Sequence, residues 1–177
     1  MPFAYYRRLN RAQQRVYQQS DEVSSVRLPS HPELASLVEG IARALESDDR
    51  RLVEAACQRL AGALAESLRI APVRVEVMAT RPSRRWGELH GLYRIRQSGA
   101  LPTITVWMRT AKRKQVVAFK TFLRTLIHEI CHHLDYELLD LRESFHTEGF
   151  YKRESSIVHQ LISSAIKTAS PAEMPAE

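Results

Sequence analysis

The most informative segment of the chain reads Leu126-Ile127-His128-Glu129-Ile130-Cys131-His132-His133. It lies inside a run in which apolar residues recur at helical spacing, so we predict a helix from about residue 116 to residue 139. Residues i and i+4 of a helix lie one turn apart on the same face. His128 and His132 are therefore expected to lie side by side, with Glu129 next to them, away from the face that packs into the core.

His-Glu-x-x-His on a helix is typical of zinc hydrolases, in which both imidazoles bind one metal ion and the glutamate acts on a water molecule there. The alternative is a pair of surface histidines on an amphipathic helix. Because a glutamate follows the first histidine and the surrounding helix is of the buried type, we predict a Zn²⁺ site. His128 and His132 are its expected ligands, and Glu129 is its expected catalytic residue. Cys131 points toward the core and is interpreted as a small buried hydrophobe.

A catalytic zinc takes three protein ligands, so the sequence beyond the motif must supply another. His146 is the first histidine after the point where the motif helix has to end and the chain reverses, and it opens the next predicted helix. We therefore predict His146 as the third metal ligand. Position 138, where the compact metzincin pattern needs a histidine, is a leucine. The residues leave four other candidates open: Glu143, Glu148, Glu154 and His159.

The rest of the chain predicts an α+β fold. Helices are expected at residues 5–22, 32–46, 50–68 and 147–168, and strands at 73–78, 88–95 and 103–108. We expect a compact zincin-like fold with N-terminal helices, a small three-stranded sheet, the motif helix and a C-terminal closing helix. The expected divisions are an N-terminal helix and linker at 1–32, the metallopeptidase domain at 33–169 and a disordered tail at 170–177.

Four further residues or segments have an expected role. Strand 103–108 is expected to hold an extended peptide by edge pairing. Asp135 lies one turn beyond His132 and either orients a ligand imidazole or is an ordinary surface residue. His90 is interpreted as a strand-face histidine and not as a metal ligand. The N-terminal helix is expected to dock on the domain, although its arginines also suit phosphate binding.

Composition limits the classes of protein that this chain can belong to. The 177 residues suit one domain with a real core. No apolar run approaches the roughly 20 residues needed to span a bilayer, the N-terminus lacks a signal-peptide core, and two cysteines give no disulfide framework. We therefore expect a cytoplasmic protein without a membrane partner. The net charge of +6 allows DNA or another polyanion to bind the basic loops 81–85 and 109–114, which can equally be solvated surface.

The segment from Thr121 to Phe150 resembles the core of the SprT-like zinc metalloproteases. In that family a strand leads into a helix bearing His-Glu-x-x-His, and a third histidine follows with an aromatic residue one turn later. The matching segments here are Ile104-Thr105-Val106, His128-Glu129-Ile130-Cys131-His132 and His146-Thr147-Glu148-Gly149-Phe150, and Gly91-Leu92-Tyr93 is also similar. The resemblance covers residues 86–160 and implies a zinc-dependent protease with Glu129 as catalytic residue and His128, His132 and His146 as zinc ligands.

The chain also departs from that family in two respects. The family's usual Gly-His-Gly around the third ligand is Phe145-His146-Thr147 here, and no cysteine-rich zinc ribbon follows. The resemblance therefore does not predict that this chain shares the family's activity on proteins crosslinked to DNA.

The sequence thus predicts a zinc metallopeptidase that acts on a protein or peptide substrate. Two alternatives stay open. One is a non-catalytic, zinc-stabilised DNA- or protein-binding module, in which His133 or Glu148 supplies a fourth ligand. The other is an ImmA/IrrE-like regulator protease with an acidic third ligand.

Overall fold

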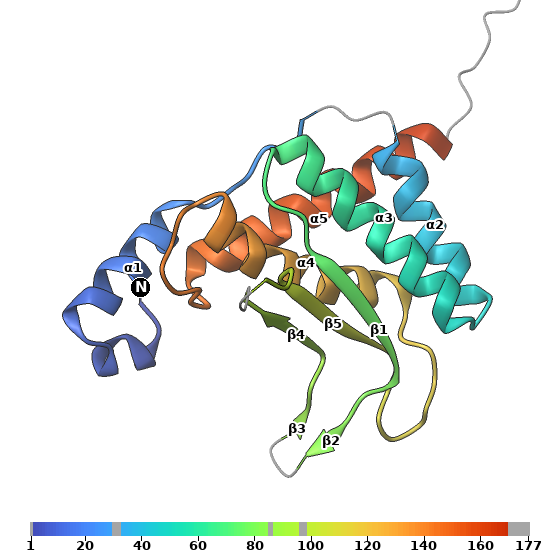
Figure 1. The fold of residues 1–177 in the computed structure, drawn as a ribbon, viewed down its shortest axis with the longest axis horizontal. Coiled ribbons are helices and arrows are strands. Elements are labelled where there is room, and N and C mark those ends of the chain that lie inside the picture. Colours follow the sequence, from blue (N-terminus) through green and yellow to red (C-terminus); the bar gives the residue numbers. More distant parts are fainter. Residues whose placement is uncertain (1, 30–32, 85–86, 96–98, 170–177) are drawn as a thin grey trace, which may run out of the picture.

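A three-stranded sheet and the helices packed around it form the centre of the molecule (Figure 1). The computed structural model describes residues 2–29, 33–84, 87–95 and 99–169. Within these residues the fold is α+β, as predicted, with five α-helices and a small sheet. The predicted tail 170–177 lies outside the described residues.

The N-terminal segment contains two helices where one was predicted. The 3₁₀ helix η1 (Ala4–Arg8) and α1 (Arg11–Glu22) are separated by Leu9 and Asn10. The Asn10 side chain accepts a hydrogen bond from the Gln13 backbone, and the Gln13 side chain accepts one from the Asn10 backbone. This reciprocal cap starts a new helix at Arg11, because the capping residue itself must be extended.

The next two helices, α2 (Leu34–Glu46) and α3 (Arg50–Leu68), pack against each other through their apolar faces. Asp49 caps α3 by accepting from the Arg51 and Leu52 backbone N–H groups. Short polar side chains are preferred at this position because they satisfy backbone donors that have no partner within the helix.

The sheet has the strand order β1 (Arg74–Thr80), β5 (Thr103–Arg109), β4 (Gly91–Arg94). β1 runs parallel to β5, and β4 runs antiparallel to it. The short strands β2 (Ser83–Arg84) and β3 (Gly87–Glu88) pair with each other. Because β5 is paired on both sides, the prediction that strand 103–108 binds a peptide by edge pairing is wrong. β4 is the edge strand next to the metal-site motif, and it is shorter than the predicted strand 88–95.

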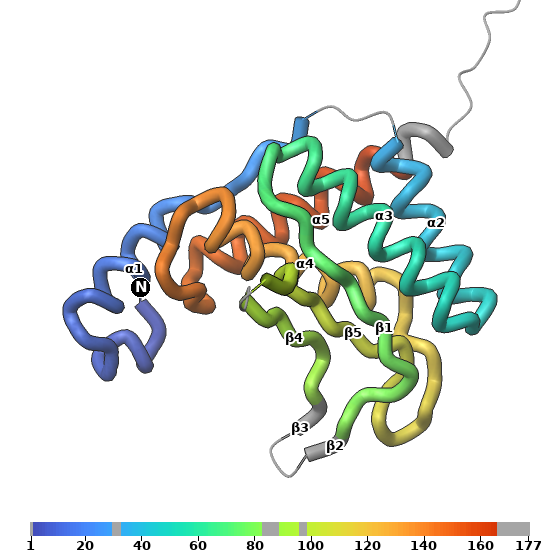
Figure 2. The backbone as a smooth tube through the Cα atoms, viewed as in Figure 1, coloured from blue at the N-terminus to red at the C-terminus, as the bar shows by residue number. Residues whose placement is uncertain are grey.

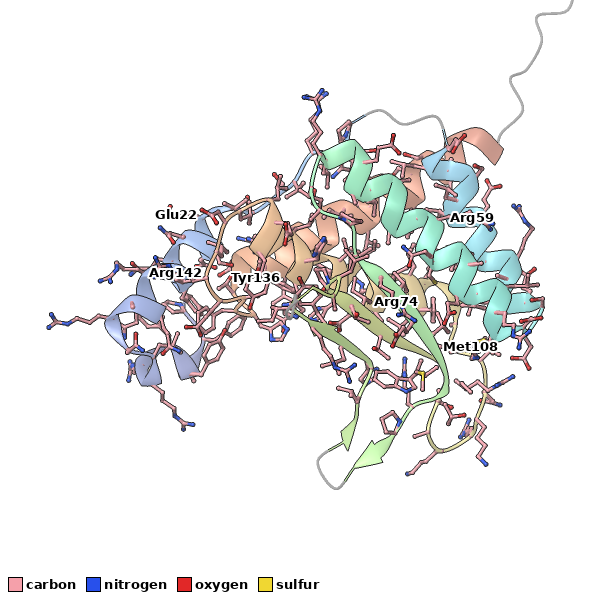
Figure 3. All side chains as sticks on the ribbon, in the orientation of Figure 1. Glu22, Arg59, Arg74, Met108, Tyr136 and Arg142 are labelled. Atoms are coloured by element: carbon pink, nitrogen blue, oxygen red, sulfur yellow. The ribbon has the colours of Figure 1, made fainter. Side chains whose placement is uncertain are left out.

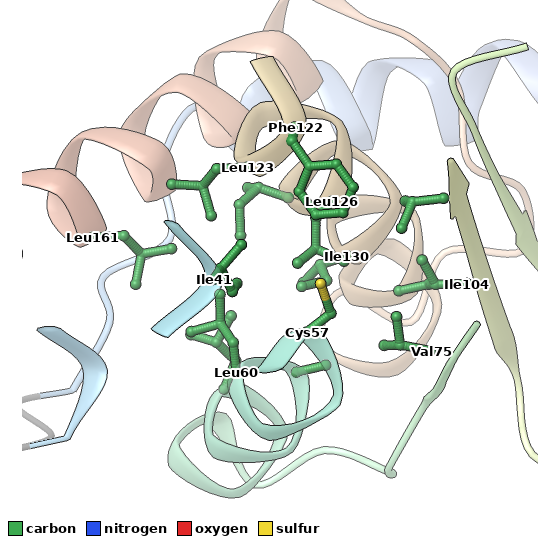
Figure 4. Close-up of a cluster of buried hydrophobic side chains, with 14 of the residues drawn as sticks. Ile41, Cys57, Leu60, Val75, Ile104, Phe122, Leu123, Leu126, Ile130 and Leu161 are labelled. Carbon is green, nitrogen blue, oxygen red and sulfur yellow. The ribbon is translucent and has the colours of Figure 1, made fainter. Parts of the chain in front are cut away.

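The core joins both helical layers to the sheet. The motif helix α4 (Phe119–Glu137) and the closing helix α5 (Glu148–Ala169) supply much of it. Figure 4 shows side chains from α2, α3, α4, α5 and both long strands meeting in one cluster, which includes Ile41, Cys57, Leu60, Val75, Ile104, Phe122, Leu126, Ile130 and Leu161. Cys131 is also fully buried, as predicted.

The N-terminal helix docks on the domain, as predicted. Tyr17 and Ser20 of α1 are buried, and the chain between α4 and α5 lies beside α1 (Figure 2). Tyr136 and Arg142 lie on this side of the molecule (Figure 3). The arginines of this segment are exposed.

Candidate metal centre

Three imidazoles meet at the surface of α4. The Nε2 atom of His146 lies 2.9 Å from Nε2 of His128 and 3.1 Å from Nε2 of His132. A tetrahedral metal ion with bonds of about 2.0–2.1 Å holds its ligand nitrogens about 3.3 Å apart. The three nitrogens are therefore close enough together to bind one metal ion. We call this group, which lies among the described residues, the His128–His132–His146 cluster.

The cluster arises because the chain folds back after α4. α4 ends at Glu137, and Asp140 has a positive φ of 50°. The Leu141 N–H then donates to the Asp135 carbonyl at 2.8 Å, which turns the chain toward α4. The fully buried Phe150, in the first turn of α5, packs under all three imidazoles with ring centroids 4.8–5.2 Å away.

Hydrogen bonds at the far ring nitrogens orient two of the histidines. Nδ1 of His128 lies 2.9 Å from Glu154 Oε2, and Nδ1 of His132 lies 2.7 Å from Ser144 Oγ. An ionised carboxylate only accepts, so His128 donates from Nδ1 and presents the Nε2 lone pair to the cluster. Glu154 also accepts from Arg124 at 2.7 Å, which leaves its carboxylate paired on both oxygens.

Burial favours the neutral form of His132 and His146. It lowers the pKa of His132 to about 3, with further lowering from His128 and His146. Burial also lowers the pKa of His146, and the neighbouring His128 adds to this effect. Only neutral imidazoles bind metal, so both residues are ready to bind at ordinary pH.

Glu129 lies beside the cluster and is 5% exposed. Burial raises the pKa of its carboxyl to about 7, against the opposing influence of His128 and a hydrogen bond from the Tyr93 backbone. Gly91 of β4 packs against it, and a Cβ atom at position 91 would lie only 2.3 Å from Glu129 Oε1. Glycine is therefore needed here because the carboxylate occupies the space of a side chain.

Two cavities flank the cluster. One of about 640 Å³ is lined by Thr121, Thr125 and Tyr151 among others, and one of about 370 Å³ by Tyr93, Tyr136 and Ser144 among others. The two cavities share four lining residues: Gly91, His128, Glu129 and His146. A groove thus runs along β4 and crosses the three histidines with Glu129 at its wall.

The remaining candidate residues lie outside the cluster. Glu148 is exposed and pairs with Lys152 at 2.8 Å, and Glu143 accepts from Gln13 at 3.1 Å. His159 is exposed on α5.

Two further histidines of the described residues, His133 and His90, have other surroundings. His133 is buried, with Nδ1 3.1 Å from the Tyr93 hydroxyl and Nε2 2.8 Å from the Ala71 carbonyl, so it packs under the sheet. His90 lines the larger cavity without joining the cluster. Asp135 is fully buried and is not an ordinary surface residue.

The basic loops contribute fewer exposed charges than predicted. Arg81 is buried, and Arg109 pairs with Asp48 at 2.6 Å. Arg85 and the Arg84 side chain lie outside the described residues. Lys112, Arg113 and Lys114 are exposed. Polyanion binding stays a prediction that now depends mainly on this second loop.

Neither models of known protein families, nor curated proteins, nor solved structures match this chain. Within the described residues, the helices are too short or too polar to cross a bilayer. Any functional interpretation therefore depends on the geometry of the candidate metal centre itself.

Proposed function

We propose that the protein is a zinc-dependent metallopeptidase of the zincin type. The observation that carries this proposal is the convergence of three Nε2 atoms, with Glu129 beside them, in an open groove. Many catalytic zinc sites have three imidazole ligands and one coordination position left free for water. When bound, zinc would lower the pKa of an attacking water and polarise the substrate carbonyl.

Glu129 supplies the proton transfers in this proposal. Its carboxylate would accept a proton from the attacking water and deliver it to the nitrogen of the leaving amine, which gives a new carboxyl end and a new amino end. In the metal-free protein, burial raises the pKa of this carboxyl to about 7, and a general base works best with a pKa near the working pH. The substrate would lie along the edge strand β4 as an extended chain.

The geometry supports the two alternatives less well. A closed structural site needs a fourth protein ligand, but His133 contacts Tyr93 and Ala71, and Glu148 pairs with Lys152. A site with an acidic third ligand needs a carboxylate in the cluster, but Glu154 contacts the far nitrogen of His128.

The decisive experiment is Glu129→Gln. The amide keeps the shape of the side chain but cannot take up the water proton, so zinc should be retained while peptidase activity falls about 10²-fold or more. Zinc content after dialysis and cleavage of an unfolded protein substrate are measured on the same preparation. Glu66→Gln, at an exposed position on α3, is the matched control. Loss of zinc from Glu129→Gln, or undiminished cleavage, would overturn the role of Glu129.

The third ligand is tested by comparing zinc content in three variants. His146→Ala should lose zinc, and Glu148→Ala should retain it. Glu154→Ala should weaken zinc binding about 10- to 100-fold, because it removes the acceptor at His128 Nδ1 without removing a ligand. Zinc retained by His146→Ala and lost by Glu148→Ala would contradict the assignment.

A further inference from the structure

A chain of hydrogen bonds leads from His132 away from the cluster. The Ser144 hydroxyl donates to Asp135 Oδ2 at 2.6 Å, so its oxygen accepts from His132 Nδ1 at 2.7 Å. The other carboxylate oxygen, Asp135 Oδ1, accepts from Arg153 Nη2 at 2.7 Å. Asp135 and Arg153 are both completely buried. The orientation of the His132 imidazole is therefore connected to a buried ion pair between α4 and α5.

Arg153 extends this chain to the N-terminal helix. Its Nη1 donates to the carbonyl oxygens of Ser20 and Val23, at 2.5 Å each, and its Nη2 lies 3.0 Å from Ser20 Oγ. The last carbonyls of a helix have no partner within the helix and carry partial negative charge. A buried guanidinium satisfies them and Asp135 together, because its donors form a planar fork.

The N-terminal segment also contacts the residues around His146. The Tyr5 hydroxyl donates to the His146 carbonyl at 2.9 Å, and the Gly149 N–H donates to Asp21 Oδ1 at 2.8 Å. A Cβ atom at position 149 would lie 2.4 Å from the Asp21 carbonyl oxygen, so α1 fits closely against the start of α5. The N-terminal segment thus contacts the His146 backbone through η1, and α1 connects to His132 through Arg153, Asp135 and Ser144.

We propose that Ser144, Asp135 and Arg153 are positioning residues through which the docked helix α1 fixes His132 for metal binding. This inference rests on the metal-binding part of the proposed function. It assigns to the N-terminal segment a role in metal affinity, in addition to its contribution to the core.

The test is Ser144→Ala, which removes one hydroxyl at a half-buried position and leaves the Asp135–Arg153 pair in place. The dissociation constants of Zn²⁺ and Co²⁺ should rise about 10- to 100-fold, and the visible absorption of the Co²⁺ form should change because one imidazole is less fixed. The metal-free protein should stay folded, with a melting temperature lower by roughly a few degrees because the buried Asp135 Oδ2 loses a donor. Ser144→Thr, which keeps the hydroxyl, should restore both metal affinity and spectrum.

Ser67→Ala is the matched control, since Ser67 is also half-buried but donates to Ala63 within α3. Arg153→Lys tests the connection to α1: one ammonium cannot hold Asp135 and both carbonyls, so metal binding should weaken. If Arg153→Lys does not fold, Ser144→Ala still decides whether the chain of hydrogen bonds affects metal affinity.

The outcomes separate this inference from the proposed function. If the parent binds zinc and Ser144→Ala binds it equally well with an unchanged Co²⁺ spectrum, the positioning role is overturned and the proposed function stands. A folded Arg153→Lys with parental metal affinity would overturn the role of α1. A parent protein that binds no metal would overturn both proposals.

Discussion

At the scale of single residues, Gly91 determines where the Glu129 carboxylate can lie. Gly91→Ala would place a methyl group 2.3 Å from Glu129 Oε1 and 2.7 Å from its Cγ, so the side chain must move. Because displacement of a reacting group by about 1 Å can cost 10²-fold, we expect peptidase activity to fall by roughly that factor while zinc is retained.

Steady-state cleavage rates and zinc content of Gly91→Ala check this expectation. Gly62→Ala is the control, because nothing lies within 4 Å of a Cβ atom there, on the exposed side of α3. It should keep full activity and gain up to about 1 kcal/mol of stability. Parental activity in Gly91→Ala would show that Glu129 is not held by this contact.

The raised pKa of Glu129 predicts how the stability of the metal-free protein depends on pH. The folded state holds the proton up to about pH 7, whereas the unfolded chain releases it near the ordinary value of 4.5. Unfolding therefore releases a proton between these values, and this residue's contribution to stability is present below pH 4.5 and is lost as pH rises to about 7. His132 acts in the opposite sense: its pKa of about 3 makes it destabilising as pH falls below 6.5.

Comparison with Glu129→Gln separates the contribution of Glu129 to stability from that of His132. The metal-free variant should gain about 3 kcal/mol of unfolding free energy relative to the parent between pH 4 and pH 8. Denaturant unfolding at several pH values, with chelator present, measures this difference. A difference that does not change with pH would mean that the pKa of Glu129 is the same in the folded and unfolded states.

Sequence reasoning identified the histidines of the cluster but not the residues that orient them. His128, Glu129 and His132 are linked by local helical spacing, and His146 could be chosen because the chain must turn back after α4. Ser144 and Glu154 reach the imidazoles only through tertiary packing, so their spacing carries no signal. Gly91, inside the predicted strand 88–95, was an indication of a close backbone approach.

At the scale of elements, helix α3 closes the outer edge of the sheet. Gln58 donates to the Val73 carbonyl and accepts from the Val75 N–H, at 3.0 and 2.8 Å. Glu54 accepts from the Val77 N–H at 2.9 Å, and Arg50 donates to the Val77 carbonyl at 2.8 Å. These side chains stand four residues apart on one face of α3 and take the place of a neighbouring strand. The β1 edge is therefore closed to strand addition, which leaves β4 for a peptide.

Removing these contacts should open the β1 edge. Glu54→Ala/Gln58→Ala should lower stability by about 2 kcal/mol, since buried backbone groups lose their partners. It should also promote self-association through β1. Denaturant unfolding and analytical ultracentrifugation test both effects, with Glu66→Ala on the exposed side of α3 as control. If the double variant is monomeric and as stable as the parent, water must replace the hydrogen bonds of Glu54 and Gln58 without loss of free energy.

The sequence predicted the existence of the helices and strands more accurately than it predicted their arrangement. Apolar periodicity predicted the helices and long strands, because it reflects local burial. It could not show that β5 is central, since strand order depends on pairing between distant segments. The break at Asn10 was missed because the capping contacts with Gln13 compete with a continuous helix, and only the cap geometry decides between them.

At the scale of the whole molecule, the candidate metal centre lies at the margin of a core that is complete without it. The buried cluster in Figure 4 draws on α2, α3, α4, α5 and the sheet. The three histidines are half-buried or exposed and come from α4 and the segment before α5. A metal ion would thus join two parts that already pack together, and the metal-free chain should remain folded.

This arrangement predicts a stabilising effect of metal with a defined size. A ligand that binds only the folded state contributes about 4 kcal/mol when present at 1,000 times its dissociation constant. For a chain of this length, that amount raises the melting temperature by roughly 10 °C. Calorimetry of the parent with chelator and then with zinc should show this shift on a protein that is folded in both conditions. His146→Ala should lose most of the shift while its chelator-treated form melts near the parental temperature. Unfolding of the parent by chelator alone would contradict this view, because the metal would then be part of the folding core.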